Sequence, residues 1–191
     1  MISGAARSER SHWSYRVKTI KKVLGFSLYI FVILILAYLL SRFVVKRTGV
    51  DGHSMEETLH DGDQLLVDQL SYRFHEPERF DIIVFPNMGT QGNLVKRIVG
   101  LPGEEVRIDE AGVIYINETP LTEHFGKEPI KDPGLAARTV KLHDGEFFVL
   151  GDNRNDSLDS RSADVGIVYE QNIIGKVWIR LLPLRRFGKV A

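Results

Sequence analysis

Ser54 lies in the polar segment VDGHSMEETLHDGDQLLVD, residues 50–68, and a serine can act as the nucleophile of a hydrolase when a base takes its proton. A Ser-His-Asp triad would use a histidine as that base, and the chain has six histidines. His53 is adjacent to Ser54 and would point away from it in an extended chain. The others considered, His60, His75, His124 and His143, lie in polar, turn-like segments. The sequence therefore singles out no histidine as the base.

A structural role is the alternative for Ser54. The sequence SMEE that begins at Ser54 fits a helix capping box, in which Ser54 caps the helix and Glu57 reaches back to it. Only Thr58 and Leu59 separate this box from the turn-like sequence HDGD, so the helix would be a single turn. The residues alone leave both roles open.

Two adjacent cations, Lys96 and Arg97, stand inside the otherwise apolar run NLVKRIVGLPGE, residues 93–104. Side chains on a strand alternate between its two faces, so one of these cations must point toward apolar surroundings. The alternative is an edge strand from which both long side chains extend to water.

The segment GDNRNDSLDSRS, residues 151–162, follows the apolar run EFFVL directly. A calcium-binding loop is excluded, because Arg154 occupies its third position, Ser157 replaces the turn glycine and Ala163 replaces the final glutamate. The acidic and imidazole groups of HDGD match no zinc or iron spacing. A solvated turn is the simplest interpretation of residues 151–162, although their polar groups could also hold a loop and orient a neighbour.

The elements that position these residues begin with an uncharged stretch, VLGFSLYIFVILILAYLLS, from Val23 to Ser41. As a helix it would be about 28 Å long, which nearly matches the hydrocarbon core of a bilayer. No small-x-small cleavage signal follows it, so we expect an uncleaved transmembrane anchor over residues 23–45. Ser54 would then lie within about 30 Å of the end of this anchor.

Charge is distributed unevenly along the chain. Residues 1–47 carry nine Lys and Arg against one Glu, and the remainder carries 16 Lys and Arg against 24 Asp and Glu, a net charge of −8. Because most of the N-terminal cations precede the apolar stretch, residues 1–22 are expected to form a cytoplasmic basic tail, with residues 46–191 outside the cytoplasm. The acidic remainder argues against a nucleic-acid partner. The absence of cysteine excludes disulfides and thiol catalysis.

Beyond the anchor, short apolar or alternating runs are separated by Gly, Pro, Asn and Asp, a pattern typical of antiparallel β structure. The expected strands are 64–70, 81–86, 93–100, 105–109, 113–117, 146–151 and 173–182. The looser stretch 118–140 has three prolines and is typical of a long loop, so we expect a small insertion near residues 110–142. The prediction is a mainly β catalytic domain, an antiparallel sheet behind one N-terminal transmembrane helix.

In this order, these stretches resemble the type I signal peptidases, membrane-bound serine proteases that remove signal peptides from exported proteins. The similar motifs are GHSMEETL, GDQLLVD, RFDIIVF, LVKRIVGLPGE and GDNRNDSLDSR, and they cover most of residues 50–178. The chain departs from the family pattern at Glu57, where proline is usual, at Gln69, where lysine is common, and at Phe80, where glycine is common.

The resemblance implies a Ser/Lys dyad. Ser54 would attack the scissile carbonyl after a small residue and form an acyl-enzyme, and Lys96 would be the general base for Ser54 and then for water. Desolvation beside Leu94 and Ile98 disfavours the ammonium, which would lower the pKa of Lys96 toward the working pH. No cofactor or metal is required by such a mechanism.

The resemblance also assigns supporting roles. Ser157 would hydrogen-bond and orient the Lys96 amine. Ion pairs that hold the loop would be formed by Asp152, Asp159 and Arg161.

For the substrate, the resemblance implies an extended chain added beside the strands that carry Gly52 and Asn93. The Ser54 backbone N–H would be one oxyanion donor, and Gly52 stands where some family members place a serine hydroxyl as the other. The shallow apolar pockets for small side chains would be lined by Met55, Leu59 and Val95.

Two other functions fit parts of the pattern. A repressor-type autoprotease shares a related Ser/Lys fold, but the anchor and the lack of a DNA-binding segment count against it. A catalytically impaired relative that helps to assemble surface proteins would lack Ser54 or Lys96; both are present, and only Glu57 keeps this alternative open. We therefore expect a cell-membrane enzyme that acts on the signal peptides of secreted preproteins, at the lipid bilayer and close to the secretion translocon.

Overall fold

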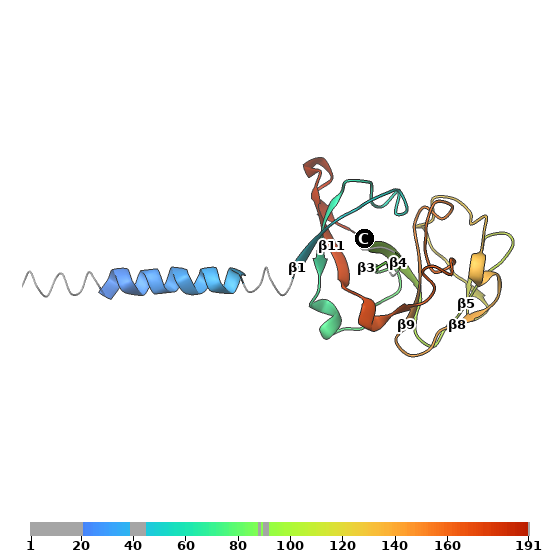
Figure 1. Cartoon of the computed structure of the whole chain (residues 1–191), viewed down its shortest axis with the longest axis horizontal. Coiled ribbons are helices and arrows are strands. Elements are labelled where there is room, and N and C mark those ends of the chain that lie inside the picture. Colours follow the sequence, from blue (N-terminus) through green and yellow to red (C-terminus); the bar gives the residue numbers. More distant parts are fainter. Residues whose placement is uncertain (1–20, 39–44, 88, 90–91, 191) are drawn as a thin grey trace, which may run out of the picture. The chain divides into compact units, whose positions relative to one another are not determined.

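A computed structural model describes residues 21–38, 45–87, 89 and 92–190. The chain divides into two units, Met1–Phe43 and Val44–Ala191, which are described separately (Figure 1). In the first unit, Lys21–Tyr38 is a helix that is long and apolar enough to cross a membrane. The rest of the expected basic tail, residues 1–20, and residues 39–44 of the expected anchor lie outside the described residues.

The second unit consists mainly of short antiparallel strands. Their bounds are β1 Val45–Gly49, β2 Gln64–Asp68, β3 Ile82–Pro86, β4 Asn93–Gly100, β5 Glu105–Ile108, β6 Ile114–Ile116, β7 Thr119–Pro120, β8 Val140–Lys141, β9 Glu146–Leu150, β10 Val168–Tyr169, β11 Gly175–Leu182 and β12 Gly188–Lys189. Short 3-10 helices are η1 Ser71–Arg73, η2 Gly134–Ala137, η3 Glu170–Asn172 and η4 Leu184–Arg186. The mainly β, antiparallel prediction is confirmed.

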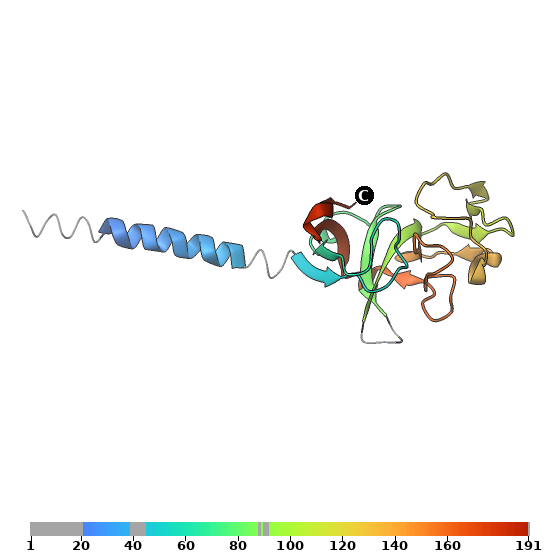
Figure 2. The same ribbon diagram turned by 90° about the horizontal axis from the view of Figure 1, so that it is seen from above.

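These strands form two sheets among the described residues. The larger has the order β1-β2-β11-β3-β4-β9-β10, with β12 paired to β11, and the smaller has the order β7-β6-β5-β8. The smaller sheet lies at the end of this unit opposite to β1 (Figures 1 and 2).

Strand β4 is internal to the larger sheet, between β3 and β9. Its register places Lys96 opposite Ile83 of β3 and Arg97 between Ile82 and Leu150. The alternative of an edge strand is therefore wrong. Lys96 is 1% exposed and Arg97 is 0% exposed, so the strand buries both cations rather than one.

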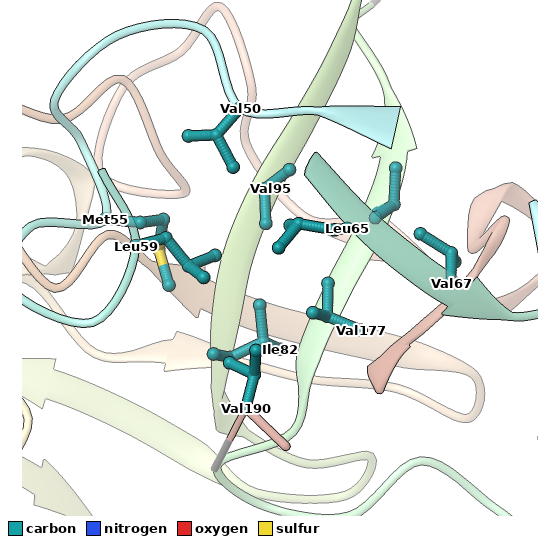
Figure 3. Close-up of a cluster of buried hydrophobic side chains, with 10 residues drawn as sticks. Val50, Met55, Leu59, Leu65, Val67, Ile82, Val95, Val177 and Val190 are labelled. Carbon is teal, nitrogen blue, oxygen red and sulfur yellow. The ribbon is translucent and has the colours of Figure 1, made fainter. Parts of the chain in front are cut away.

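A cluster of buried side chains connects the segment around Ser54 to the larger sheet (Figure 3). Met55 and Leu59 of that segment pack in the same cluster as Val95 of β4. Leu65 and Val67 of β2 also join it, because alternate residues of this strand face inward. The cluster gives the turns that carry Ser54 a fixed apolar base.

The stretch expected to be an insertion is part of the smaller sheet. Strands β5 and β6 contribute to a second buried cluster that they share with β4 and β9 of the larger sheet, and Ile130 and Ala136 of the chain between β7 and β8 join it. At the β5–β6 turn, Gly112 has φ +80°, and a Cβ there would lie 2.4 Å from the Ile130 carbonyl oxygen. The long connection between β7 and β8 is thus held to the rest of the unit at Ile130 and Ala136, while most of its other residues are exposed.

Candidate active site

Ser54 lies in a series of turns between β1 and β2. The Glu56 N–H donates to the His53 carbonyl (3.1 Å) and the Leu59 N–H to the Met55 carbonyl (2.8 Å), but residues 53–59 form no helix. The capping-box interpretation is therefore wrong. The buried side chains of Met55 and Leu59, rather than a helix cap, hold the segment in place. Ser54 itself remains half-buried above β4.

The Lys96 amine meets the Ser54 hydroxyl, with 2.6 Å between Nζ and Oγ. Nζ also donates to the carbonyl oxygen of Val95 at 3.1 Å. Burial of the amine lowers the pKa of Lys96 to about 8, although the carboxylates of Asp159 and Asp152 act in the opposite direction. A lysine with this pKa is neutral in a useful fraction of molecules near neutral pH, and it is within reach of the hydroxyl proton.

Among the described residues, no histidine takes that position. His53 faces Glu56 instead, with 2.8 Å between Nδ1 and Oε1, and this contact raises the pKa of His53. Ser54 and Lys96 are therefore brought together as the resemblance implied, and a Ser-His-Asp arrangement is not formed at Ser54.

Asp152 forms a bidentate ion pair with Arg97, and both side chains are 0% exposed. The distances are 2.9 Å from Nε to Oδ1 and 2.8 Å from Nη2 to Oδ2. The Thr58 hydroxyl donates to the same carboxylate at 2.6 Å, and Arg97 Nη1 donates to the Phe80 carbonyl at 2.9 Å. The pair therefore ties the nucleophile segment to β4 and to the residues after β9.

Sequence reasoning did not assign this role to Arg97 or Thr58. The sequence did contain one indication of this ion pair, namely a second cation inside an apolar run. An arginine that is buried in an internal strand needs a carboxylate beside it. Asp152 was expected in an ion pair, but nothing in the sequence identified its partner.

Asp159 and Arg161 form the other expected ion pair. Arg161 Nε donates to Oδ1 of Asp159 at 2.9 Å, and Nη2 donates to Oδ2 at 2.8 Å. Asp159 also accepts the Gly151 N–H at 3.1 Å, while Arg161 Nη2 donates to the Arg154 carbonyl at 2.5 Å. These bonds close the loop 151–162 on itself beside the dyad.

Ser157 lies in this loop, but the expected hydrogen bond to Lys96 is not formed. Its Oγ is buried and has no hydrogen-bond partner in the described part of the chain. A Cβ at Gly151 would lie 2.2 Å from the Ser157 Oγ and 2.4 Å from the Ser54 carbonyl oxygen. The missing side chain of Gly151 is what allows the loop to approach the nucleophile segment so closely.

Asn153 is a second contact that the sequence did not reveal. Its backbone N–H donates to the Ser54 carbonyl at 3.1 Å, and its Nδ2 donates to the His53 carbonyl at 3.1 Å. The loop thus holds the backbone on both sides of the Ser54 amide, which is the group expected to face an oxyanion.

The residues expected to contact the substrate differ in their exposure to solvent. Gly52, with φ +91°, is half-buried and donates its N–H to Asp61 Oδ1 at 2.9 Å. Asn93 is exposed at the start of β4, and Val95 is 8% exposed to solvent. Met55 and Leu59 are 1% and 0% exposed, so in this conformation they have no surface to offer a substrate and serve as core residues.

A separate ion-pair cluster holds the end of the nucleophile segment. Asp63 is 0% exposed and accepts from Arg180 Nη1 at 2.9 Å and from Arg186 Nη2 at 2.7 Å. Arg180 Nη1 also donates to the Thr58 carbonyl at 3.2 Å. Two arginines therefore pair with the buried carboxylate of the acidic HDGD turn. Among the described residues, no group of three His, Cys, Asp or Glu side chains is placed to hold a metal ion.

An antiparallel β framework that sets a serine hydroxyl against a buried lysine defines the class of serine hydrolases in which lysine replaces histidine as the base. A family model described as signal peptidase, peptidase S26, matches residues 23–182. The chain belongs to this family.

Curated relatives agree with this assignment. The chain is 40% identical to a probable signal peptidase I-1 of Synechocystis sp. over 83% of this chain and 82% of that protein. It is 37% identical to a signal peptidase I of Leptolyngbya laminosa over 82% and 78%. A crystal structure of a signal peptidase I from Enterococcus faecalis V583 is 31% identical and covers 53% of this chain and 97% of that one, with a TM-score of 0.42.

Proposed function

We propose that this protein removes signal peptides from exported preproteins, with Ser54 as the nucleophile and Lys96 as the general base. The observation that carries the assignment of roles is the 2.6 Å contact between Lys96 Nζ and Ser54 Oγ, made by a lysine that is 1% exposed. Membership of the signal peptidase family supplies the substrate class.

The reaction begins when the neutral Lys96 amine takes the proton of the Ser54 hydroxyl, and Oγ attacks the scissile carbonyl. Negative charge develops on the carbonyl oxygen, and the Ser54 backbone N–H donates to it. Protonated Lys96 then gives its proton to the leaving amine, which is the new N-terminus of the mature protein. The cleaved signal peptide remains as an ester of Ser54.

Hydrolysis of this ester repeats the same proton transfers with water in place of serine. Lys96 takes a proton from the water, which attacks the ester carbonyl, and then returns a proton to Ser54 Oγ as the bond breaks. Asp152, Asp159, Arg161 and Ser157 take no part in these transfers. In the proposal Asp152, Asp159 and Arg161 hold the loop beside the dyad through their ion pairs, whereas Ser157 makes no hydrogen bond to the amine among the described residues.

The substrate binds as an extended chain beside Gly52 and Asn93, because the first part of β4, residues 93–96, pairs with β3 but has no register partner in β9 and so offers one backbone edge for strand addition. Small residues are preferred before the cut. Of the three residues expected to line a shallow pocket, Met55, Leu59 and Val95, all are buried in this conformation, and Val95 at 8% is the most exposed of them.

The helix Lys21–Tyr38 supports a membrane location. In this proposal it is the core of the anchor expected over residues 23–45, which is shortened at its end because Val45 already pairs with Asp68 in the sheet; the basic tail 1–22 is cytoplasmic, and the catalytic unit 46–191 acts outside the cytoplasm near the translocon. The positive charges that precede the helix are the basis for that orientation.

Cleavage of a model preprotein by the full-length, detergent-solubilised protein tests the assignment. Ser54→Ala should abolish cleavage at the signal junction, and Ser162→Ala, at a half-buried position of the neighbouring loop where, among the described residues, the hydroxyl accepts only the Asp164 N–H, is the matched control. Cleavage by folded Ser54→Ala would refute the role of Ser54. Binding of the preprotein without cleavage by the native protein would favour the assembly-factor alternative.

A further inference from the structure

Residues 123–127, in the long connection between β7 and β8, lie against the candidate active site. The Lys127 N–H donates to the Asp152 carbonyl oxygen at 3.0 Å, and Glu123 pairs with Arg154, with 2.8 Å between Oε2 and Nη2. A Cβ at Gly126 would lie 3.3 Å from the Arg154 guanidinium carbon. This part of the connection, which we call the 123–127 segment, is therefore fixed to the loop that carries Asp152.

Phe125, in the middle of the 123–127 segment, covers Arg97. Its ring centroid lies 3.7 Å from Arg97 Cζ, a close cation–π contact. Phe80 lies beside the ring, with 5.0 Å between the two centroids. The guanidinium thus has Asp152 at its edge and an aromatic ring on its face, and it is 0% exposed.

This cover matters because a buried ion pair keeps its geometry only while its partners exclude water and satisfy its hydrogen bonds. The carboxylate of Asp152 holds the nucleophile segment through Thr58 and also acts on the charge of Lys96. Removal of the ring would admit water to the Arg97–Asp152 pair and loosen both constraints.

We propose that Phe125 is a positioning residue for the Ser54/Lys96 dyad, acting by stacking on Arg97 and so fixing Asp152. The inference rests on the proposed function of that dyad. It adds a residue from the connection between β7 and β8 to the machinery of the site.

The expected effect on pH dependence follows from the charges around the dyad. Lys96 is faced by the carboxylates of Asp152 and Asp159, and Arg97 neutralises the first of these. The 123–127 segment adds Glu123, paired with Arg154, and Lys127, which lies 3.6 Å from Glu56. Water entry and a less neutralised Asp152 both favour the ammonium, so loss of the ring should raise the pKa of Lys96.

The test compares Phe125→Leu, which keeps an apolar side chain but loses the ring, with Phe125→Tyr, which keeps the ring. Tyr115→Leu is the matched control, because Tyr115 makes the other cation–π contact of the described residues, over Arg107 at 4.3 Å on the smaller sheet. The measurements are kcat/KM of the full-length protein on a preprotein across pH, and thermal unfolding by circular dichroism.

Phe125→Leu should lower kcat/KM about tenfold and move its acid limb to higher pH, whereas Phe125→Tyr and Tyr115→Leu should keep the native profile. A folded Phe125→Leu protein with the native profile would overturn the proposal, as would equal effects of Phe125→Leu and Tyr115→Leu. If Phe125→Leu fails to fold, Phe125→Met, with a flexible apolar side chain, is judged by the same outcomes. Full activity of Ser54→Ala would instead refute the dyad itself, so the two failures are distinguishable.

Discussion

At the scale of single residues, the proposed chemistry depends on one side chain being placed where its charged form is disfavoured. Lys96 extends from an internal strand, is almost fully buried and has no carboxylate within ion-pair distance in the described part of the chain, while Arg97 beside it is paired with Asp152. The two adjacent cations on this strand thus lie in different electrostatic environments. Arg97 is paired with a buried carboxylate, whereas Lys96 faces the Ser54 hydroxyl, where the proposed function requires a base.

The pH dependence of the reaction follows from the pKa of Lys96, which burial lowers to about 8. The base must be neutral, so kcat/KM should rise with pH through about 8 and level off above it. Measurement of kcat/KM on one preprotein between pH 6 and pH 10 checks this expectation. An acid limb near the ordinary lysine value of about 10.4 would contradict it.

The variant Lys96→Arg tests whether Lys96 acts as a base or only supplies positive charge. A guanidinium keeps the positive charge but cannot give up its proton at these pH values, so this variant should be nearly as inactive as Lys96→Ala. Circular dichroism establishes that both variants fold. Substantial turnover by folded Lys96→Arg would mean that Lys96 supplies charge and that the base lies elsewhere.

At the scale of elements, the turns that carry Ser54 are held at two points by ion pairs between residues far apart in the sequence. Thr58 reaches the Arg97–Asp152 pair, and Asp63 binds Arg180 of β11 and Arg186 of η4. The C-terminal part of the chain is thereby a support for the nucleophile segment.

Asp63→Asn tests this support. The substitution leaves two arginines beside an uncharged amide, so unfolding should become easier by about 3 kcal/mol and cleavage should decrease together with stability. Asp144→Asn, at an exposed turn before β9, is the matched control and should change neither. Chemical denaturation and preprotein cleavage measure both effects, and native stability in Asp63→Asn would show that the cluster is dispensable.

The sequence predicted the long strands well because each combines an apolar run with clear turn residues. All seven expected strands are present, and β4 begins and ends at the expected residues. The strands that were missed, apart from β1, are two residues long, too short to show any period. Strand β1, VKRTG, was missed because its cations and glycine resemble a linker, whereas pairing with β2 is what makes it a strand.

Site residues that belong to a recognisable sequence motif could be predicted. Contacts that depend on a partner far away in the sequence could not. Ser54 and Lys96 were found by resemblance and are in contact. The stacking of Phe125 on Arg97 was missed because residues 118–140 contain prolines and little periodicity, so their packing depends on tertiary contacts alone. The burial of Met55 and Leu59 was missed because short turns give no inward or outward pattern.

At the scale of the whole molecule, the charge asymmetry predicts the orientation in the membrane. Protease added to intact spheroplasts should digest residues 46–191 and spare residues 1–22, because the positive-inside bias retains the basic tail in the cytoplasm. Lysed spheroplasts are the control, in which both parts should be digested. Protection of the whole chain in intact spheroplasts would overturn this topology.

The burial of Lys96 also has a thermodynamic consequence for the fold. The unfolded chain binds a proton at Lys96 up to its ordinary pKa of about 10.4, while the folded protein releases it near pH 8. Between these values the unfolded state holds more protons, so the free energy of unfolding should rise with pH; below about pH 8 the buried amine costs the fold about 3 kcal/mol. Lys96→Met should therefore melt at a higher temperature than the native protein at pH 7, and this difference should shrink toward pH 10.5. A buried amine in this position thus lowers the heat resistance of the folded protein at neutral pH.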